Sequence, residues 1–245
     1  MKTAFQRRHL LSRAGSSENA SQWLDSAYDD DGWWALAWIA AYDVTGNDDY
    51  LELAEGIFSA LPIWPIVRYP DEYLNWAQTQ WNWFSAQGFM GENGTINDGL
   101  LDNCQNNGQT VWSYNQGVVL GGLVELNKAA PDATLLEFAN HIAQAAIATL
   151  ADENMVVHDS CEPSNCAPDA TQFKGIFIRN LHMLQQVSPH HIYKQVIDSC
   201  ARSMWANDRN SQNQLGVDWA GPFQGVADMS THSSAMDALV AAIGG

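Results

Sequence analysis

Apolar side chains recur at intervals of three and four residues along most of the chain, the spacing that places them on one face of an α-helix. This pattern predicts helices over 32–45, 48–60, 71–87, 112–128, 133–150, 171–187, 190–206 and 229–243. Clusters of Gly, Asn, Asp and Pro, such as those at 88–99 and 159–169, separate these segments and predict loops. No set of segments alternates apolar and polar residues as strands do, so the sequence predicts an all-α fold of paired helices.

A weak internal repeat supports this interpretation. The segments 47–54, 70–77 and 131–139 each place a turn and an acidic residue before a helix, with Leu and Ala on one of its faces. Recurrent helix pairs predict an α/α toroid, in which inner helices frame a central cleft. The first two copies are much closer in sequence than the last two, with room for only one helix between them. The spacing therefore predicts that an inner helix is missing near 61–65.

Composition and charge limit the possible functions. The chain has 245 residues, of which 46% are hydrophobic, and this suits one large domain with a buried core. The net charge of −17 repels phosphate backbones, so nucleic-acid binding is not expected. No apolar run approaches the length of a membrane span. Eleven tryptophans in a chain rich in Asn, Gln and Asp favour a cleft that faces carbohydrate.

The cysteines indicate an oxidising compartment. Four cysteines allow three pairings, and Cys161 and Cys166 could close a small loop. A zinc site is the alternative, but the spacing fits no common zinc pattern and no histidine lies within the loop. We therefore expect a disulfide. The sequons at Asn19 and Asn93 agree with secretion. We expect no metal and no cofactor, because the histidines that we considered show no ligand spacing: His141, His182, His190, His191 and His232.

The N-terminus shows no signal peptide. Residues 1–13 contain four basic side chains, but no apolar segment follows them. We expect residues 1–27 to form an N-terminal segment and residues 28–245 to form a single domain.

Candidate catalytic residues stand at the start of the first predicted helix, in the run DDDGWWALA at 29–37. Adjacent carboxylates repel, so one of a close pair holds its proton more tightly than the other. One ionised and one protonated carboxyl are what the hydrolysis of a glycosidic bond uses. Trp33 and Trp34 supply flat apolar faces of the kind against which sugar rings pack. The alternative is that the three acids only cap the helix.

Further candidates for substrate binding are polar residues expected at helix starts and in loops: Tyr114, Asn115, Gln116, Lys174, Arg179 and Asp98. The hydroxyl and amides of the first three suit hydrogen bonds with sugar hydroxyls, and the two cations could orient a carboxylate or a sugar. Other interpretations remain for each. The segment 114–116 could be a solvated helix start, Lys174 and Arg179 could pair with Asp169 or another acid, and Asp98 could be a solvated loop acid.

Taken together, these segments resemble glycoside hydrolase family 76, the endo-α-1,6-mannanases and their fungal cell-wall relatives. The similar segments follow the family's order: 29–37, 41–46, 113–117, 173–179 and a closing segment formed by 219–222 and 233–235. The resemblance implies an (α/α)6 toroid that hydrolyses α-1,6-mannosidic linkages in mannan with retention of configuration. It also implies that Asp29 is the nucleophile and Asp30 the general acid/base.

The chain departs from the family pattern in two places. The family has further helices before its paired aspartates, and a segment that is absent here around 61–68. About eight helices of a twelve-helix toroid are therefore expected, with apolar residues such as Trp64 and Ile66 left exposed. A cell-wall transglycosidase of the same family and an inert carbohydrate-binding remnant are the alternative functions. The resemblance implies that the parent protein is extracellular or associated with the cell wall.

Overall fold

The computed structural model describes residues 17–24, 28–59, 70–225 and 227–244, with the backbone alone for 17–19, 28, 29, 59 and 70–73. The chain divides into two compact units, Met1–Tyr73 and Leu74–Gly245. The described residues form eight α-helices and no strand beyond isolated bridges, so the predicted all-α fold is confirmed. The segment around 61–68, with Trp64 and Ile66, lies outside the described residues. One domain over 28–245 stays a prediction.

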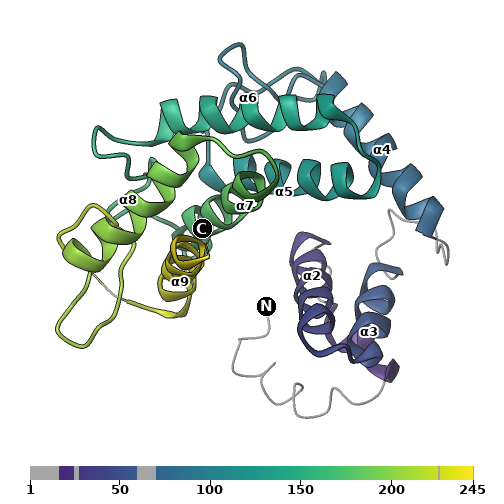
Figure 1. Ribbon diagram of the computed structural model, residues 1–245, viewed down its shortest axis with the longest axis horizontal. Helices are drawn as coiled ribbons and strands as arrows, with labels where there is room; N and C mark the ends of the chain where they lie inside the picture. The colour runs from purple at the N-terminus through teal and green to yellow at the C-terminus, as the bar shows by residue number, and fades with distance from the viewer. Residues whose placement is uncertain (1–16, 25–27, 60–69, 226, 245) are drawn as a thin grey trace. The chain divides into compact units, whose positions relative to one another are not determined.

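All eight predicted helices are present (Figure 1). They are α2 (Tyr28–Thr45), α3 (Asp48–Ser59), α4 (Pro70–Ala86), α5 (Ser113–Ala129), α6 (Ala133–Leu150), α7 (Phe173–Val187), α8 (His191–Asn207) and α9 (Met229–Ile243), with the short 3-10 helices η1 (Ser17–Gln22) and η2 (Ala170–Gln172). Seven of them begin and end within about two residues of the predicted positions, the usual uncertainty of helix ends. The eighth, α2, begins four residues earlier than predicted, at Tyr28.

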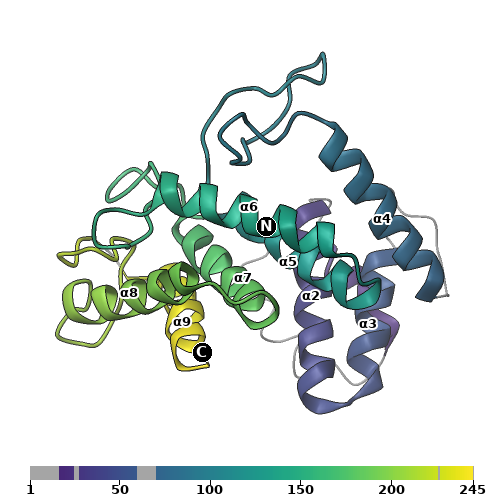
Figure 2. The same cartoon turned by 45° about the horizontal axis from the view of Figure 1, so that its top comes forward.

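Aromatic packing holds the first unit together. Trp23, directly after η1, is buried, and its ring centroid lies 4.5 Å from that of Trp34 and 5.0 Å from that of Trp38, both in α2. Trp38 also stacks on Tyr50 of α3 at 5.2 Å. Such aromatic pairs stabilise a fold beyond their buried area. Figure 2 shows the result, α2 and α3 side by side. Part of the tryptophan surplus is therefore structural.

Helices of the second unit pack in two layers. The inner helices α5, α7 and α9 contact one another with α7 in the middle, whereas α6 packs on α5, and α8 packs on α7 and α9. Buried apolar side chains such as Leu120, Phe177 and Met204 fill the space between the layers. The α4 helix adds Trp81, whose ring meets Phe138 of α6 edge-on at 5.4 Å.

Two glycines let the inner helices approach closely. A Cβ atom on Gly117 of α5 would lie 2.6 Å from the Cα of Phe177 in α7, and one on Gly175 of α7 would lie 2.5 Å from the Cα of Ser234 in α9. Only a residue without Cβ fits such a crossing. The Ser234 hydroxyl also accepts a hydrogen bond from the Gly175 N–H at 2.9 Å. Both glycines belong to segments that carry the family resemblance, so part of that resemblance reflects packing.

Four short loops of the second unit share one geometry. Antiparallel bridges join Met90 to Ile96, Leu100 to Asn106, Ala151 to Val157 and Arg209 to Leu215. Two positions before the second member of each pair stands a residue with positive φ: Gly94, Cys104, Met155 and Asn213. These loops lie between α4 and α5, between α6 and α7, and between α8 and α9. The repeat places Asp98 and Asp159 at equivalent positions, two residues beyond their bridges.

No helix among the described residues combines the length and the low polarity that crossing a membrane requires.

Candidate functional site

An acid from a distant loop anchors the first turn of α5. The Asp159 carboxylate accepts a hydrogen bond from the Ser113 backbone N–H at 2.8 Å and another from the Ser113 hydroxyl at 2.6 Å. The first N–H groups of a helix have no partner within it, and the side chain of the preceding Trp112 makes no capping hydrogen bond. Asp159 therefore performs the cap from outside the helix. Its burial raises the pKa of its carboxyl group, although the hydrogen bonds from Ser113 oppose that shift.

The next two residues of α5 are predicted site residues, and both are half-buried. The Tyr114 ring packs against Phe173, the first residue of α7, with centroids 4.2 Å apart. The Asn115 amide donates a hydrogen bond to the Asp98 carboxylate at 3.4 Å. The structure thus brings Tyr114, Asn115 and Asp98 together at the start of one inner helix. Their predicted role in sugar binding remains a prediction.

Gln116 is fully buried and holds a loop in place. Its amide nitrogen donates to the carbonyls of Ile96 at 2.8 Å and Trp112 at 3.0 Å, and its amide oxygen accepts from the Ile96 N–H at 2.8 Å. Both donors and one acceptor site are therefore used inside the protein. The geometry favours a structural role for Gln116 over the predicted contact with a sugar.

The two predicted cations both pair with acids, as the alternative interpretation from the sequence holds. The Lys174 ammonium is buried and lies 2.8 Å from the Glu162 carboxylate and 2.7 Å from the Val217 carbonyl, with the Trp219 ring centroid at 4.5 Å. The partner is Glu162 and not Asp169. A buried ammonium needs such compensation because desolvating a charge is costly. Arg179, which is half-exposed, lies 3.0 Å from Asp237.

A histidine extends this buried pair. The His158 ring lies 3.4 Å from the carboxylates of both Asp152 and Glu162. The hydrogen bond with Glu162 is the largest cause of the raised His158 pKa. Conversely, the charge of Lys174 and the bond from His158 outweigh burial and lower the pKa of Glu162. Ligand atoms of His158, Glu162 and Asp218 lie within 4.8 Å of one another and could hold a metal ion. The Lys174 ammonium already supplies a fixed positive charge at Glu162.

Asp208 is a buried acid whose pKa is strongly raised. Its side chain is fully buried at the end of α8, and neither carboxylate oxygen has a hydrogen-bond partner among the described residues. Burial raises its pKa from 3.8 to about 7, with the Lys174 charge opposing the rise and the Asp218 charge adding to it. Close approach by Gly216 leaves no room for another side chain, since a Cβ there would lie 2.7 Å from an Asp208 oxygen.

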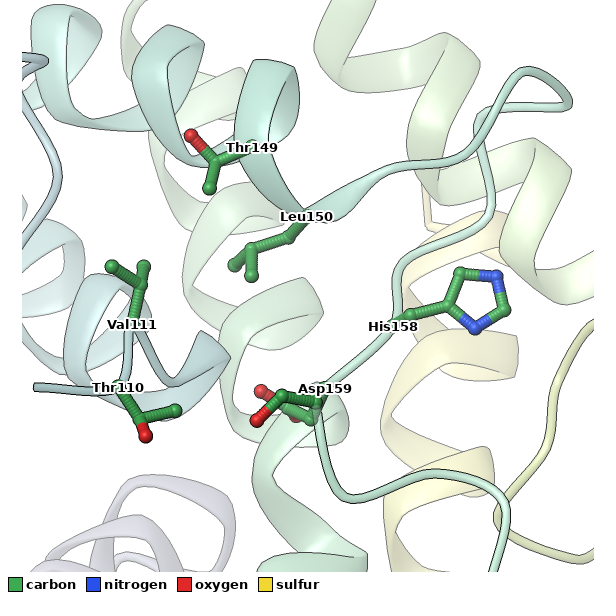
Figure 3. A pocket seen from close by; sticks show the side chains of 7 residues that line it. Thr110, Val111, Thr149, Leu150, His158 and Asp159 are labelled. Carbon is green, nitrogen blue, oxygen red and sulfur yellow. The ribbon is translucent and has the colours of Figure 1, made fainter.

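A pocket of about 470 Å³ opens beside the Asp159–Ser113 contact (Figure 3). Thr110 and Val111 precede α5, Thr149 and Leu150 end α6, and the loop after α6 supplies the rest of the lining, including Asp159. In Figure 3 the Asp159 side chain points toward Thr110, whereas the His158 ring points to the other side of its chain. This alternation is that of extended backbone.

The predicted catalytic acids belong to the first unit. Because α2 begins at Tyr28, Asp29, Asp30 and Asp31 lie in its first turn, where the helix dipole favours negative charge. The side chain of Asp29 lies outside the described residues. Asp30 is half-buried, and Asp31 is 2% exposed.

The tryptophans that follow these acids differ in exposure. Trp33 is 37% exposed, whereas Trp34 packs against Trp23 in the core of the first unit. A surface for a sugar ring is therefore easier to assign to Trp33. The roles of both residues stay predictions.

The sequence did not single out Asp159, Glu162, His158 and Asp208. The first three lie in the loop after α6, whereas Asp208 lies at the end of α8, and no recognisable spacing links these polar residues before the fold is known. The disulfide was predicted correctly: Cys161 and Cys166 are bonded, with their Cα atoms 4.7 Å apart, and Glu162 lies inside the loop that they close. Cys104 and Cys200 are free.

Comparison with known proteins gives one consistent picture. The model of glycosyl hydrolase family 76 matches residues 68–243. Over 207 residues the chain is 26% identical to mannan endo-1,6-alpha-mannosidase DCW1 of Candida albicans, covering 79% of this chain and 44% of that protein. The chain thus spans less than half the length of this relative.

Solved structures show the same fold. The GH76A alpha-1,6-mannanase from Salegentibacter sp. HEL1_6 superposes with a TM-score of 0.77 at 19% identity, covering 97% of this chain and 80% of that one. An inactive variant of that enzyme has two adjacent aspartates replaced by asparagine and binds alpha-1,6-mannotriose. It superposes with a TM-score of 0.75 at 18% identity, covering 90% of this chain and 76% of that one. The predicted toroid class, incomplete relative to these structures, is therefore confirmed.

Proposed function

Since the chain belongs to glycosyl hydrolase family 76, we propose that it cleaves α-1,6-mannosidic linkages in mannan and retains the anomeric configuration. The family match, over most of the second unit, is the observation that carries this proposal. It is supported by relatives that are named mannan endo-1,6-alpha-mannosidases and by the mannanase fold of the Salegentibacter enzyme. A glycosidase of this kind needs no metal or cofactor, because two carboxyl groups perform the chemistry.

In this proposal Asp29 is the nucleophile and Asp30 the general acid/base. In the first step Asp30 protonates the leaving oxygen while Asp29 forms a covalent bond with the mannosyl group. In the second step water hydrolyses this mannosyl-enzyme, and Asp30 acts as the base that takes a proton from the water. Two observations support the pair. Both residues lie in the first turn of α2, and the inactive Salegentibacter variant carries asparagine at two adjacent aspartate positions. Because Asp29 and Asp30 precede the matched residues 68–243, their assignment as the catalytic pair rests on the motif at 29–37.

Substrate contacts are proposed for residues that keep polar or aromatic surface exposed. Trp33 offers an exposed indole, and Asn115 with Asp98 offers an amide and a carboxylate at the start of α5. Tyr114 adds a hydroxyl, although its ring packs on Phe173. Such groups suit the alternating donors and acceptors of a sugar ring.

A transglycosidase would use the same residues. It would pass the mannosyl group from the covalent intermediate to a sugar hydroxyl, whereas a hydrolase passes it to water. The two are distinguished by incubating the chain with α-1,6-mannan, with and without a short oligosaccharide acceptor, and by analysing the products with mass spectrometry. Acceptor-linked products at the expense of free reducing ends would assign transfer, and free reducing ends in both samples would assign hydrolysis.

An inert carbohydrate-binding remnant is the remaining alternative. If circular dichroism shows a cooperatively folded chain that binds oligomannoside but gives neither product, the catalytic proposal is wrong and the remnant is correct. We also propose an oxidising, extracellular or cell-wall location for the parent protein. The Cys161–Cys166 disulfide supports it, because such bonds persist mainly outside reducing compartments.

A further inference from the structure

The pocket beside Asp159 has the dimensions and the lining of a small-ligand site. Its volume of about 470 Å³ lies in the range of pockets that hold small molecules. Val111 and Leu150 supply apolar surface, and Thr110, Thr149 and Ser160 supply hydroxyl groups. Hydroxyls spaced around an apolar surface match a sugar ring, which presents C–H groups on its faces and hydroxyls at its edge.

Asp159 forms the acidic wall of this pocket, and neighbouring residues hold it in place. Both oxygens of Asp159 are oriented by Ser113, as described above. The Asp159 backbone N–H donates to the Glu162 carboxylate at 2.9 Å. Glu162 is itself held by the buried Lys174 and lies within the disulfide loop from Cys161. The wall is thus formed before any ligand arrives, which lowers the entropic cost of binding.

The charge at the wall limits the ligand class. Each carboxylate oxygen has two acceptor sites, so Asp159 can accept further hydrogen bonds in addition to those from Ser113. The Asp159 carboxylate disfavours an anionic ligand beside it, and the ring of His158, the other ionisable residue of the lining, points to the other side of its chain (Figure 3). A neutral polyol can donate its hydroxyls to Asp159 and to the threonines.

We propose that this pocket binds one neutral pyranose unit, and that in the intact protein the unit belongs to the mannan chain or to a branch of it. The choice of mannose as the sugar rests on the proposed function, whereas the proposal that this pocket binds a sugar rests on its geometry alone. The contacts expected are the Asp159 carboxylate and the Thr110 and Thr149 hydroxyls as hydrogen-bond partners, with the sugar's C–H face on Leu150.

The test follows threonine methyl signals by NMR in the full chain during titration with methyl α-D-mannopyranoside. Signals of Thr110 and Thr149 should shift saturably below about 100 mM ligand, a weak but measurable affinity. Thr79 is the internal control, because it is exposed on α4 and its hydroxyl bonds to the Asn75 carbonyl. Substitution of single threonines by valine assigns each signal.

A double variant then tests the contacts. Thr110→Val with Thr149→Val keeps the shape of the pocket and removes two hydroxyls, so binding should weaken by about tenfold or more, measured by calorimetry. Thr79→Val should leave binding unchanged. Absence of saturable shifts at the two pocket threonines, or equal affinity in the double variant with an unchanged melting temperature, would overturn the proposal. A chain that binds here without cleaving mannan would contradict the proposed function alone.

Discussion

The Lys174 ammonium and the Glu162 carboxylate form a buried ion pair at 2.8 Å, with only 2% and 5% of their side chains exposed. The pair joins the first turn of α7 to a loop that a disulfide closes. It lies beside residues on which the α5 site depends, because Glu162 also accepts the Asp159 N–H. Removing one member leaves the other charge buried without full compensation.

We therefore expect Lys174→Met to destabilise the chain by about 3–5 kcal/mol, as breaking buried pairs does. Lys128→Met is the matched control, because Lys128 lies 2.7 Å from Glu125 but both side chains are more than half exposed. That change should cost less than about 0.5 kcal/mol. Urea unfolding of both variants measures the two values, and equal effects would refute a structural role for Lys174.

Asp208 should make the protein less stable as the pH rises. Its pKa is raised from 3.8 to about 7, so the folded state binds a proton that the unfolded state has already lost in this interval. The contribution of this group to the free energy of unfolding is fully present below about pH 4 and is lost between about pH 4 and 7. Above that interval the protein is less stable by up to about 4 kcal/mol.

Asp208→Asn removes this titration. The variant should be more stable than the wild type at pH 8, and its advantage should vanish at pH 4. Chemical denaturation at both pH values measures the difference, with Asp102→Asn in an exposed loop as control. An advantage of equal size at both pH values would show that Asp208 does not titrate as described.

Gly175→Ala should be strongly destabilising although both residues are compatible with a helix. The new Cβ would meet the Ser234 Cα at 2.5 Å and the Ser234 carbonyl at 2.7 Å, so α7 and α9 would have to separate. Overpacking of this kind costs about 1–3 kcal/mol. The same substitution at Gly122 of α5 meets no atom of the described residues within 4 Å and should stabilise by about 0.5–1 kcal/mol. Thermal unfolding of the two variants gives the comparison, and a shift of the same sign in both would contradict the close crossing.

Much of the helical architecture could be predicted from the sequence. Helical periodicity in segments such as 133–150 and 229–243 depends only on neighbouring residues, and these two helices have the predicted ends. The early start of α2 was missed because Tyr28 and the acids after it are not apolar, whereas the preference of acids for a first turn acts independently of that pattern.

The contacts of the site could be predicted only in part. Tyr114 and Asn115 lie in one recognisable segment at the start of α5, and their role in sugar binding stays a prediction. Gln116 in the same segment was assigned to the substrate, but it clamps a loop twenty positions away. Asp159 meets Ser113 across 46 positions, and such pairings depend on how helices pack and not on local sequence.

Release of reducing ends from α-1,6-mannan by the purified chain measures whether Asp29 and Asp30 perform the proposed cleavage. Asp29→Asn and Asp30→Asn should each reduce the rate by about 10²-fold or more. Asp43→Asn, an exposed position on the same helix, should keep the wild-type rate. Circular dichroism must show equal helix content in all four proteins. We expect cleavage to be lost in the first two variants alone, and equal cleavage by all four proteins would exclude Asp29 and Asp30 as the catalytic pair.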